Sequence, residues 1–166
     1  MDNQSNAEIW RKIRRVKNEI SVEEGRELLK SCRRGALSVN GDNGFPYVMP
    51  VNFYYDEGDD KVYIHSARKG HKIESIAKDS RVCFTTWDNG KRIEGDWADE
   101  VRSVVVFGEA EIVSDLIIKE DRLRKFGNKY YPNPEEVEEE IKEGFRNVEL
   151  ISIKICHISA KKVQEK

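Results

Sequence analysis

The densest group of candidate binding residues lies in segment 63–72, Tyr-Ile-His-Ser-Ala-Arg-Lys-Gly-His-Lys. The pattern predicts that a strand ends here, a glycine turn follows and a helix begins. Free N–H groups at a helix start favour a phosphate, and Gly70 allows its close approach. Ser66 adds a hydroxyl donor. The turn therefore predicts a phosphate site, although a solvated lysine-rich turn has the same composition. Its cationic side chains are Arg68, Lys69, His71 and Lys72.

A second candidate is the segment Val48-Met49-Pro50-Val51-Asn52-Phe53. Pro50 interrupts good strand formers and donates no ladder hydrogen bond, so the strand must be an edge strand or bulged near Pro50. A bulge would leave backbone donors and acceptors free for a planar ring that carries alternating carbonyls and nitrogens. Asn52 would add a side-chain amide. The alternative is an edge strand that proline protects from aggregation.

A third candidate is the pair Arg102–Ser103, which opens an otherwise apolar strand. An arginine at the mouth of such a strand can serve as a second anion ligand. The alternative is a surface ion pair with the neighbouring Asp99 or Glu100.

Hydrophobic periodicity, together with the glycine, proline and capping residues that begin or end elements, predicts the helices and strands that must position these residues. Residues 1–6 are expected to be disordered, and residues 7–34 to form two N-terminal helices. The second opens on the capping box Ser21–Glu24 and ends at the C-cap Gly35. Later helices are expected at 71–77, at 116–126 after Ser114, and from 134 to about Gly144. Six strands are predicted: 36–40, 45–56, 61–66, 81–87, 101–113 with a bulge at Gly108, and 148–159.

The early strands have short connections and suggest a meander. The whole pattern predicts one α+β domain, residues 1–166, built around a closed or split antiparallel barrel with flanking helices.

Bulk composition limits the function classes. The 166 residues contain 29 basic and 31 acidic side chains, a net charge of −2, so any anion site must be local. The basic segment 11–17 is read as a helix on the barrel rather than a nucleic-acid site. Three distant cysteines indicate neither disulfides nor a metal site. With no signal peptide and no membrane span expected, the predicted location is cytoplasmic.

Taken in order, these residues resemble the pyridoxamine 5'-phosphate oxidase-like FMN-binding split barrels, and most closely the nitroimidazole-resistance proteins. The similarity extends over about residues 13–160. The matching stretches are Ile13–Arg15, Gly35–Val39, Pro46–Val51, His65–Lys72, Arg102–Gly108 and Ile151–Ile153.

The resemblance implies a Greek-key split barrel that forms a homodimer with FMN in two interface clefts; FAD or a deazaflavin is the alternative cofactor. It places the flavin ring against Met49, Pro50, Val51 and Asn52. Arg102 and Ser103, from the same or the second subunit, would lie near the cofactor, and His71 would be the catalytic proton donor. Ribityl and phosphate would meet His65, Ser66, Ala67, Arg68, Lys69, Gly70 and Lys72.

The implied function is an FMN-dependent oxidoreductase that takes electrons from a small donor and reduces nitroimidazole-like or other small acceptors. A non-catalytic flavin carrier or redox sensor would share every binding residue. A pyridoxamine-phosphate-oxidase-like enzyme is disfavoured, because Lys161–Lys166, after the last predicted strand, lacks that enzyme's substrate-binding tryptophan and arginine. Residues 88–99 form a longer, more charged loop than the family pattern, and Trp97 has no counterpart in it.

Overall fold

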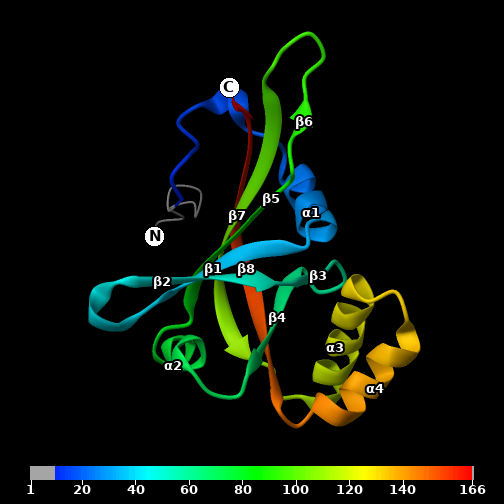
Figure 1. Cartoon of the computed structure of the whole chain (residues 1–166). Helices are drawn as coiled ribbons and strands as arrows, with labels where there is room; N and C mark the ends of the chain where they lie inside the picture. The colour runs from blue at the N-terminus through cyan, green and yellow to red at the C-terminus, as the bar shows by residue number, and fades with distance from the viewer. Residues whose placement is uncertain (1–9, 166) are drawn as a thin grey trace, which may run out of the picture.

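The computed structural model describes residues 10–165 as one curled antiparallel sheet with helices packed against it (Figure 1). The strand order is β2-β1-β5-β7-β8-β4-β3, with the short β6 paired to β7. The strands are β1 Arg34–Asn40, β2 Pro46–Asn52, β3 Tyr54–Asp56, β4 Lys61–Ala67, β5 Arg81–Trp87, β6 Lys91–Arg92, β7 Asp99–Ile112 and β8 Val148–Glu165.

The two ends of the sheet are consecutive in sequence. β2 lies at one edge and β3 at the other, and only Phe53 separates them. The sheet therefore curls until its edges approach without pairing to each other, which is the geometry of a split barrel. The expected α+β class and split barrel are confirmed. The consecutive pairings of the expected meander form, since β1 pairs with β2 and β3 with β4, but the long strand expected at 45–56 is divided at Phe53 between the two edges.

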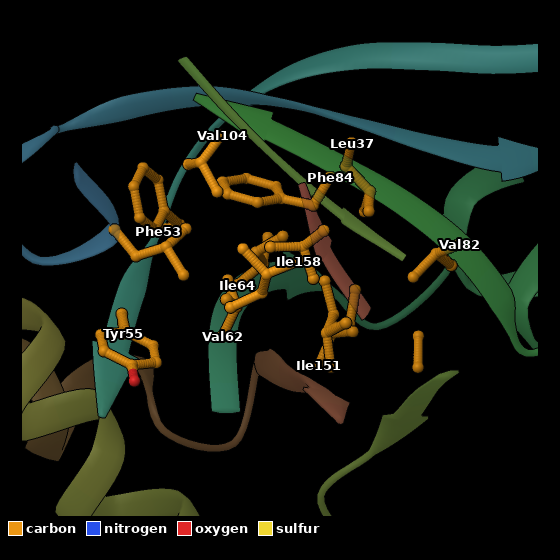
Figure 2. Close-up of a cluster of buried hydrophobic side chains, with 14 of the residues drawn as sticks. Leu37, Phe53, Tyr55, Val62, Ile64, Val82, Phe84, Val104, Ile151 and Ile158 are labelled. Atoms are coloured by element: carbon orange, nitrogen blue, oxygen red, sulfur yellow. The ribbon is translucent and has the colours of Figure 1, made fainter. Parts of the chain in front are cut away.

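The barrel interior holds a continuous apolar core (Figure 2). Phe53, fully buried at the junction, makes an edge-on contact with Phe84 of β5, with ring centroids 4.7 Å apart. Gly35 of β1 lies over the same ring, and a Cβ there would come within 2.5 Å of Phe84. Residues from both sheet edges thus share one core, and this holds the barrel curled.

The backbone polar groups of Phe53 form hydrogen bonds with side chains rather than with a neighbouring strand. Its N–H donates to the Tyr130 hydroxyl at 3.0 Å, and that hydroxyl lies 2.7 Å from the Phe53 carbonyl oxygen. Lys129 Nζ donates to the same carbonyl at 3.2 Å and lies over the Phe53 ring. Burial lowers the pKa of Lys129 to about 8. The end of one helix therefore satisfies the polar groups that the split leaves without strand partners.

The two longest strands, β7 and β8, run through the middle of the sheet (Figure 1). Their register shifts beside Gly108, where β8 carries one extra residue, Cys156. Ile151 and Ile153 are buried before the shift, and Ile158 and Ala160 after it, so the bulge changes which alternate positions face the core. A Cβ on Gly108 would come within 2.5 Å of the Lys154 carbonyl oxygen. The predicted bulge at Gly108 is confirmed.

Four helices flank the sheet: α1 Val22–Ser31, α2 His71–Lys78, α3 Leu116–Tyr130 and α4 Pro134–Gly144. The predicted capping box of α1 forms as expected. α3 and α4 lie together on one side of β4, with α2 on its other side (Figure 1). Gly127 permits the α3–α4 approach, because a Cβ there would come within 2.5 Å of Val137. None of the described helices combines the length and apolar character needed to span a membrane.

Several expected boundaries are corrected. Of the helix expected over 7–20, the described residues form only a 3₁₀ turn, Val16–Asn18; residues 1–9 lie outside the described part of the chain. α1 ends at Ser31, and Gly35 is a strand residue because Phe84 leaves no room for a side chain there.

Three further corrections concern later elements. Asp115, not Ser114, caps α3. The loop 88–100 contains β6, and the strand expected at 45–56 is divided into β2 and β3, so the described residues form eight strands instead of six. β8 continues to Glu165 because β7 offers pairing partners as far as Asp99. Lys161–Glu165 is therefore strand, not a tail.

Tyr130→Phe should lower the free energy of unfolding by about 1–3 kcal/mol, because it leaves the buried Phe53 N–H without an acceptor. Tyr131→Phe is the matched control, since Tyr131 is exposed and its hydroxyl makes no hydrogen bond within residues 10–165. Urea unfolding of both variants measures the difference. Equal stability of the two variants would show that the junction does not depend on Tyr130.

Candidate functional site

A cleft lies between the edge strand β2 and the segment that joins β4 to α2. It has two adjoining recesses of about 480 and 250 Å³, with Pro50 and Lys72 in the walls of both. Asn52, His65 and Arg34 line the larger recess, and Ser66, Lys69 and His71 contribute to the smaller one. The two segments singled out in the sequence, 49–52 and 65–72, therefore meet across one cavity of the size of a small-molecule site.

The walls of this cleft carry cationic side chains and no carboxylate. Lys72 is half-buried and has no acidic partner among residues 10–165. Burial lowers the pKa of Lys72, since a desolvated ammonium without a partner is disfavoured. A half-buried cation of this kind is stabilised by an anionic ligand.

The start of α2 opens onto the smaller recess. The N-cap residue is Gly70, and no side chain within the described residues caps this helix. Gly70 has φ +131°, a conformation that a side chain would strain. The first N–H groups of α2 are therefore left for solvent or a ligand, next to Lys69 and Lys72. This geometry agrees with the phosphate site predicted from the turn.

β2 exposes free backbone groups because it is an edge strand, and not because it is bulged at Pro50. Its pairing with β1 continues without a shift from Pro46 to Asn52, and Pro50 lies opposite Ala36. β2 is instead the edge of the sheet, so its outer side has no strand partner within the described chain. The bulge is wrong and the edge strand is confirmed; free backbone groups still border the cleft.

His71, the first residue of α2, is held from two sides. Its ring stacks on Tyr47 with centroids 4.2 Å apart, and its Nε2 lies 3.5 Å from Asp42 Oδ2. Asp42 also pairs with Lys78 at the other end of α2. The imidazole is thus positioned at the wall of the smaller recess while part of it stays exposed.

His65 marks the far end of the larger recess. Its ring meets Phe126 of α3 edge-on at 4.9 Å and stays open to solvent through the cleft. The surrounding walls and the nearby Lys72 charge lower the pKa of His65, which favours its neutral form. His65 and Asn52 also line a further cavity of about 420 Å³ between α3 and α4.

Some predicted site residues do not line the cleft. Arg68 points to Glu149 of β8, with 3.4 Å between Nε and Oε1. Ala67 pairs with Val148 at the end of β4 and forms no part of the recess walls. Arg102 forms an ion pair with Asp88 at 2.8 Å, not with Asp99 or Glu100, and Ser103 lies beside it opposite Trp87.

The cleft also contains residues that sequence reasoning missed. Arg34 lines the larger recess because it opens β1 opposite Asn52. The sequence pattern places Arg34 at the end of a helix, so it gives no indication that Arg34 lines a binding cleft. Tyr47 was noted only as part of a strand, although its spacing of two from Met49 places both on one side of β2. The cavity between α3 and α4 had no sequence signal.

The chain belongs to the pyridoxamine 5'-phosphate oxidase family, because residues 21–162 match the family model of that description. This confirms the resemblance drawn from the motifs. No curated protein matches the chain significantly.

Solved structures share the fold at low sequence identity. One is a candidate 5-nitroimidazole antibiotic resistance protein from Bacteroides thetaiotaomicron, at 21% identity and TM-score 0.72, covering 87% of this chain and 85% of that one. Another is a conserved hypothetical protein from Mycobacterium tuberculosis, at 20% identity and TM-score 0.76, covering 90% and 89%. A third is an FAD-binding protein from Mesorhizobium loti, at 24% identity and TM-score 0.63, covering 87% and 96%.

The lowered pKa of Lys72 gives a pH-dependent prediction. Lys72 binds an anion only while it is protonated, so affinity for inorganic phosphate should fall with rising pH before an ordinary lysine would titrate, near about 10.4. Lys72→Arg should keep its affinity over that range, because arginine stays charged. Calorimetric titration from neutral to alkaline pH tests this. A parallel decline in both proteins would exclude Lys72 as the responsible group.

Proposed function

We propose that the chain is an FMN-binding oxidoreductase that reduces small acceptors such as nitroimidazoles. The observation that carries the proposal is the half-buried Lys72 beside the start of α2, because within residues 10–165 it has no acidic partner, the helix has no side-chain cap and no carboxylate lines the cleft. A phosphate monoester satisfies both the cation and the free N–H groups. The family membership and the Mesorhizobium loti FAD-binding protein of the same fold support a flavin as the molecule that carries this phosphate.

The cleft residues fit the parts of such a cofactor. Lys72, Lys69, Ser66 and the start of α2 would hold the phosphate, while Arg34 of β1 adds a third cationic side chain from the larger recess. The outer edge of β2 and the Asn52 amide would meet the heteroatoms of the ring, with Pro50 supplying an apolar wall. Arg68 is assigned no part here, because Glu149 holds it.

A bound flavin supplies the hydride and electron transfer, and the chain supplies orientation and protons. His71 would deliver a proton to the acceptor, since imidazole exchanges protons near neutral pH. Tyr47 and Asp42 fix its ring. The electron donor and the acceptor would both be small molecules.

We also propose that the chain acts as a homodimer. Trp87 and Phe107 are exposed on neighbouring strands β5 and β7, and such large apolar groups commonly mark an interface. Ser103 lies directly opposite Trp87 in the ladder. A second copy that covers this face would contact Ser103, which lies on the same side of β7 as Phe107. This contact gives Ser103 a route to a cleft that it does not reach in its own chain.

The purified protein should be yellow, or should take up FMN from solution with a red-shifted, structured visible band. Lys72→Ala and Arg34→Ala should each weaken FMN binding by about 10- to 100-fold, because each removes a charge-assisted contact. Lys78→Ala is the matched control, from the other end of the same helix. A colourless protein that takes up no FMN would overturn the proposal.

His71→Ala should bind FMN normally and lose about 10²–10⁴-fold in the rate of nitroimidazole reduction, the usual contribution of a general acid. Rapid mixing of the reduced protein with the acceptor measures this step. If the wild type reduces no member of a broad acceptor panel, the protein is a flavin carrier or sensor instead. An unchanged rate in His71→Ala would remove that residue from the chemistry.

Sedimentation equilibrium should give twice the 19.3 kDa chain mass. Trp87→Asp places a charge in the proposed interface and should shift the mass towards the monomer. Exposed Trp97, which lies on the separate 88–98 loop, provides the control Trp97→Asp. A monomeric wild type at micromolar concentration would exclude the dimer.

A further inference from the structure

The cavity between α3 and α4 has a different character from the basic cleft. Its volume is about 420 Å³, and most of its walls are apolar or aromatic. Phe126 and Tyr130 stack with ring centroids 5.1 Å apart on the α3 side. Val137, Ile141 and Phe145 close it from α4 and the turn that follows. We call this cavity the aryl pocket.

The aryl pocket is framed by packed and hydrogen-bonded elements. Gly127 and Val137 hold α3 and α4 at close approach. Tyr130 is hydrogen bonded to the backbone at Phe53, which ties the pocket wall to the junction between the sheet edges. The pocket is therefore part of the folded framework and not a gap between loosely packed helices.

The charges in the aryl pocket are opposite to those of the cleft. Glu136 and Glu140, one turn apart on α4, are its acidic lining residues, and no lysine or arginine lines it. Glu136 accepts a hydrogen bond from the Asn133 amide at 3.1 Å. Glu140 has no ion-pair partner within residues 10–165. His65 at the entrance favours its neutral form, so it does not offset these charges.

The two cavities adjoin through shared residues. Asn52 and His65 line both the larger recess of the cleft and the aryl pocket. A ring lying along β2 would therefore have the basic phosphate region at one end and an aromatic, acidic pocket at the other. A second molecule seated in the aryl pocket would meet it at Asn52 and His65.

We propose that the aryl pocket binds a small planar aromatic molecule that carries a cationic group. The aromatic walls fit the ring, and Glu136 and Glu140 fit an ammonium or amidinium substituent. This inference goes beyond the proposed function, because the binding does not depend on catalysis and leaves the acceptor of the proposed reaction near His71.

The test uses three probes of equal size: 4-nitrobenzylamine, 4-nitrobenzyl alcohol and 4-nitrobenzoate, which are cationic, neutral and anionic at neutral pH. Calorimetry on the full chain saturated with FMN should rank their affinities in that order. The double variant Glu136→Gln/Glu140→Gln should bind the amine about tenfold more weakly and should bind the alcohol with unchanged affinity. Each of the two exposed ion pairs contributes up to about fivefold in affinity, and the double variant removes both.

The matched control is Glu139→Gln/Glu143→Gln, which removes the same charge from α4 outside the pocket lining and should leave the ranking intact. Ile141→Trp should fill the pocket and weaken all three probes. Preferential binding of 4-nitrobenzoate would overturn the inference, because Glu136 and Glu140 should repel a carboxylate in the aryl pocket. So would equal effects of the two double variants on the amine.

The same titrations without FMN separate the two proposals. A protein that takes up FMN but shows no amine preference overturns the aryl pocket alone. A protein that takes up no FMN but binds the amine, with loss in Glu136→Gln/Glu140→Gln, overturns the flavin proposal and supports the pocket.

Discussion

The structure depends on how the split of the barrel is closed at Phe53. The strands on either side of this residue belong to opposite edges of the sheet, so its backbone polar groups have no ladder to join. Tyr130 and Lys129 from the end of α3 supply the missing partners, and the Phe53 ring enters the core against Phe84. A buried amide without these partners would cost free energy comparable to a lost hydrogen bond.

The same closure positions both cavities. Asn52, immediately before Phe53, is fixed between the basic cleft and the aryl pocket, and Tyr130 forms part of the pocket wall. A chain with a net charge of −2 thus separates its local charges, with Lys69 and Lys72 at the start of α2 and carboxylates on α4. The two residues shared by the cleft and the aryl pocket, Asn52 and His65, are uncharged or favour a neutral form, so each end can recognise its own kind of group.

Much of the site could be predicted from sequence because its signals are local. The strand, glycine turn and helix at 61–78 follow from hydrophobic period and from Gly70, and the proline at position 50 indicates an edge strand. Arg34 was missed because the boundary between α1 and β1 depends on how Phe84 packs over Gly35, which is a tertiary contact. The α3–α4 cavity depends on Gly127 meeting Val137, and no periodicity within either helix encodes that pairing.

The prediction of a helix over residues 7–20 is wrong for a related reason. Ile13, Val16 and Ile20 have helical spacing, yet among the described residues only Val16–Asn18 turns, and Ile20 bonds to Ala160 of β8 instead. The extended β8 offers a backbone partner that competes with the helix, and sequence reasoning had ended that strand at 159.

The central claim is that the cleft recognises the phosphate of a flavin. The most direct measurement compares the affinities of FMN and riboflavin, which differ only in that phosphate, for the wild-type protein and for Lys72→Ala. We expect FMN to bind the wild-type protein at least about tenfold more tightly than riboflavin does. Most of this difference in affinity should disappear in Lys72→Ala. Equal affinities for FMN and riboflavin in the wild type would contradict it.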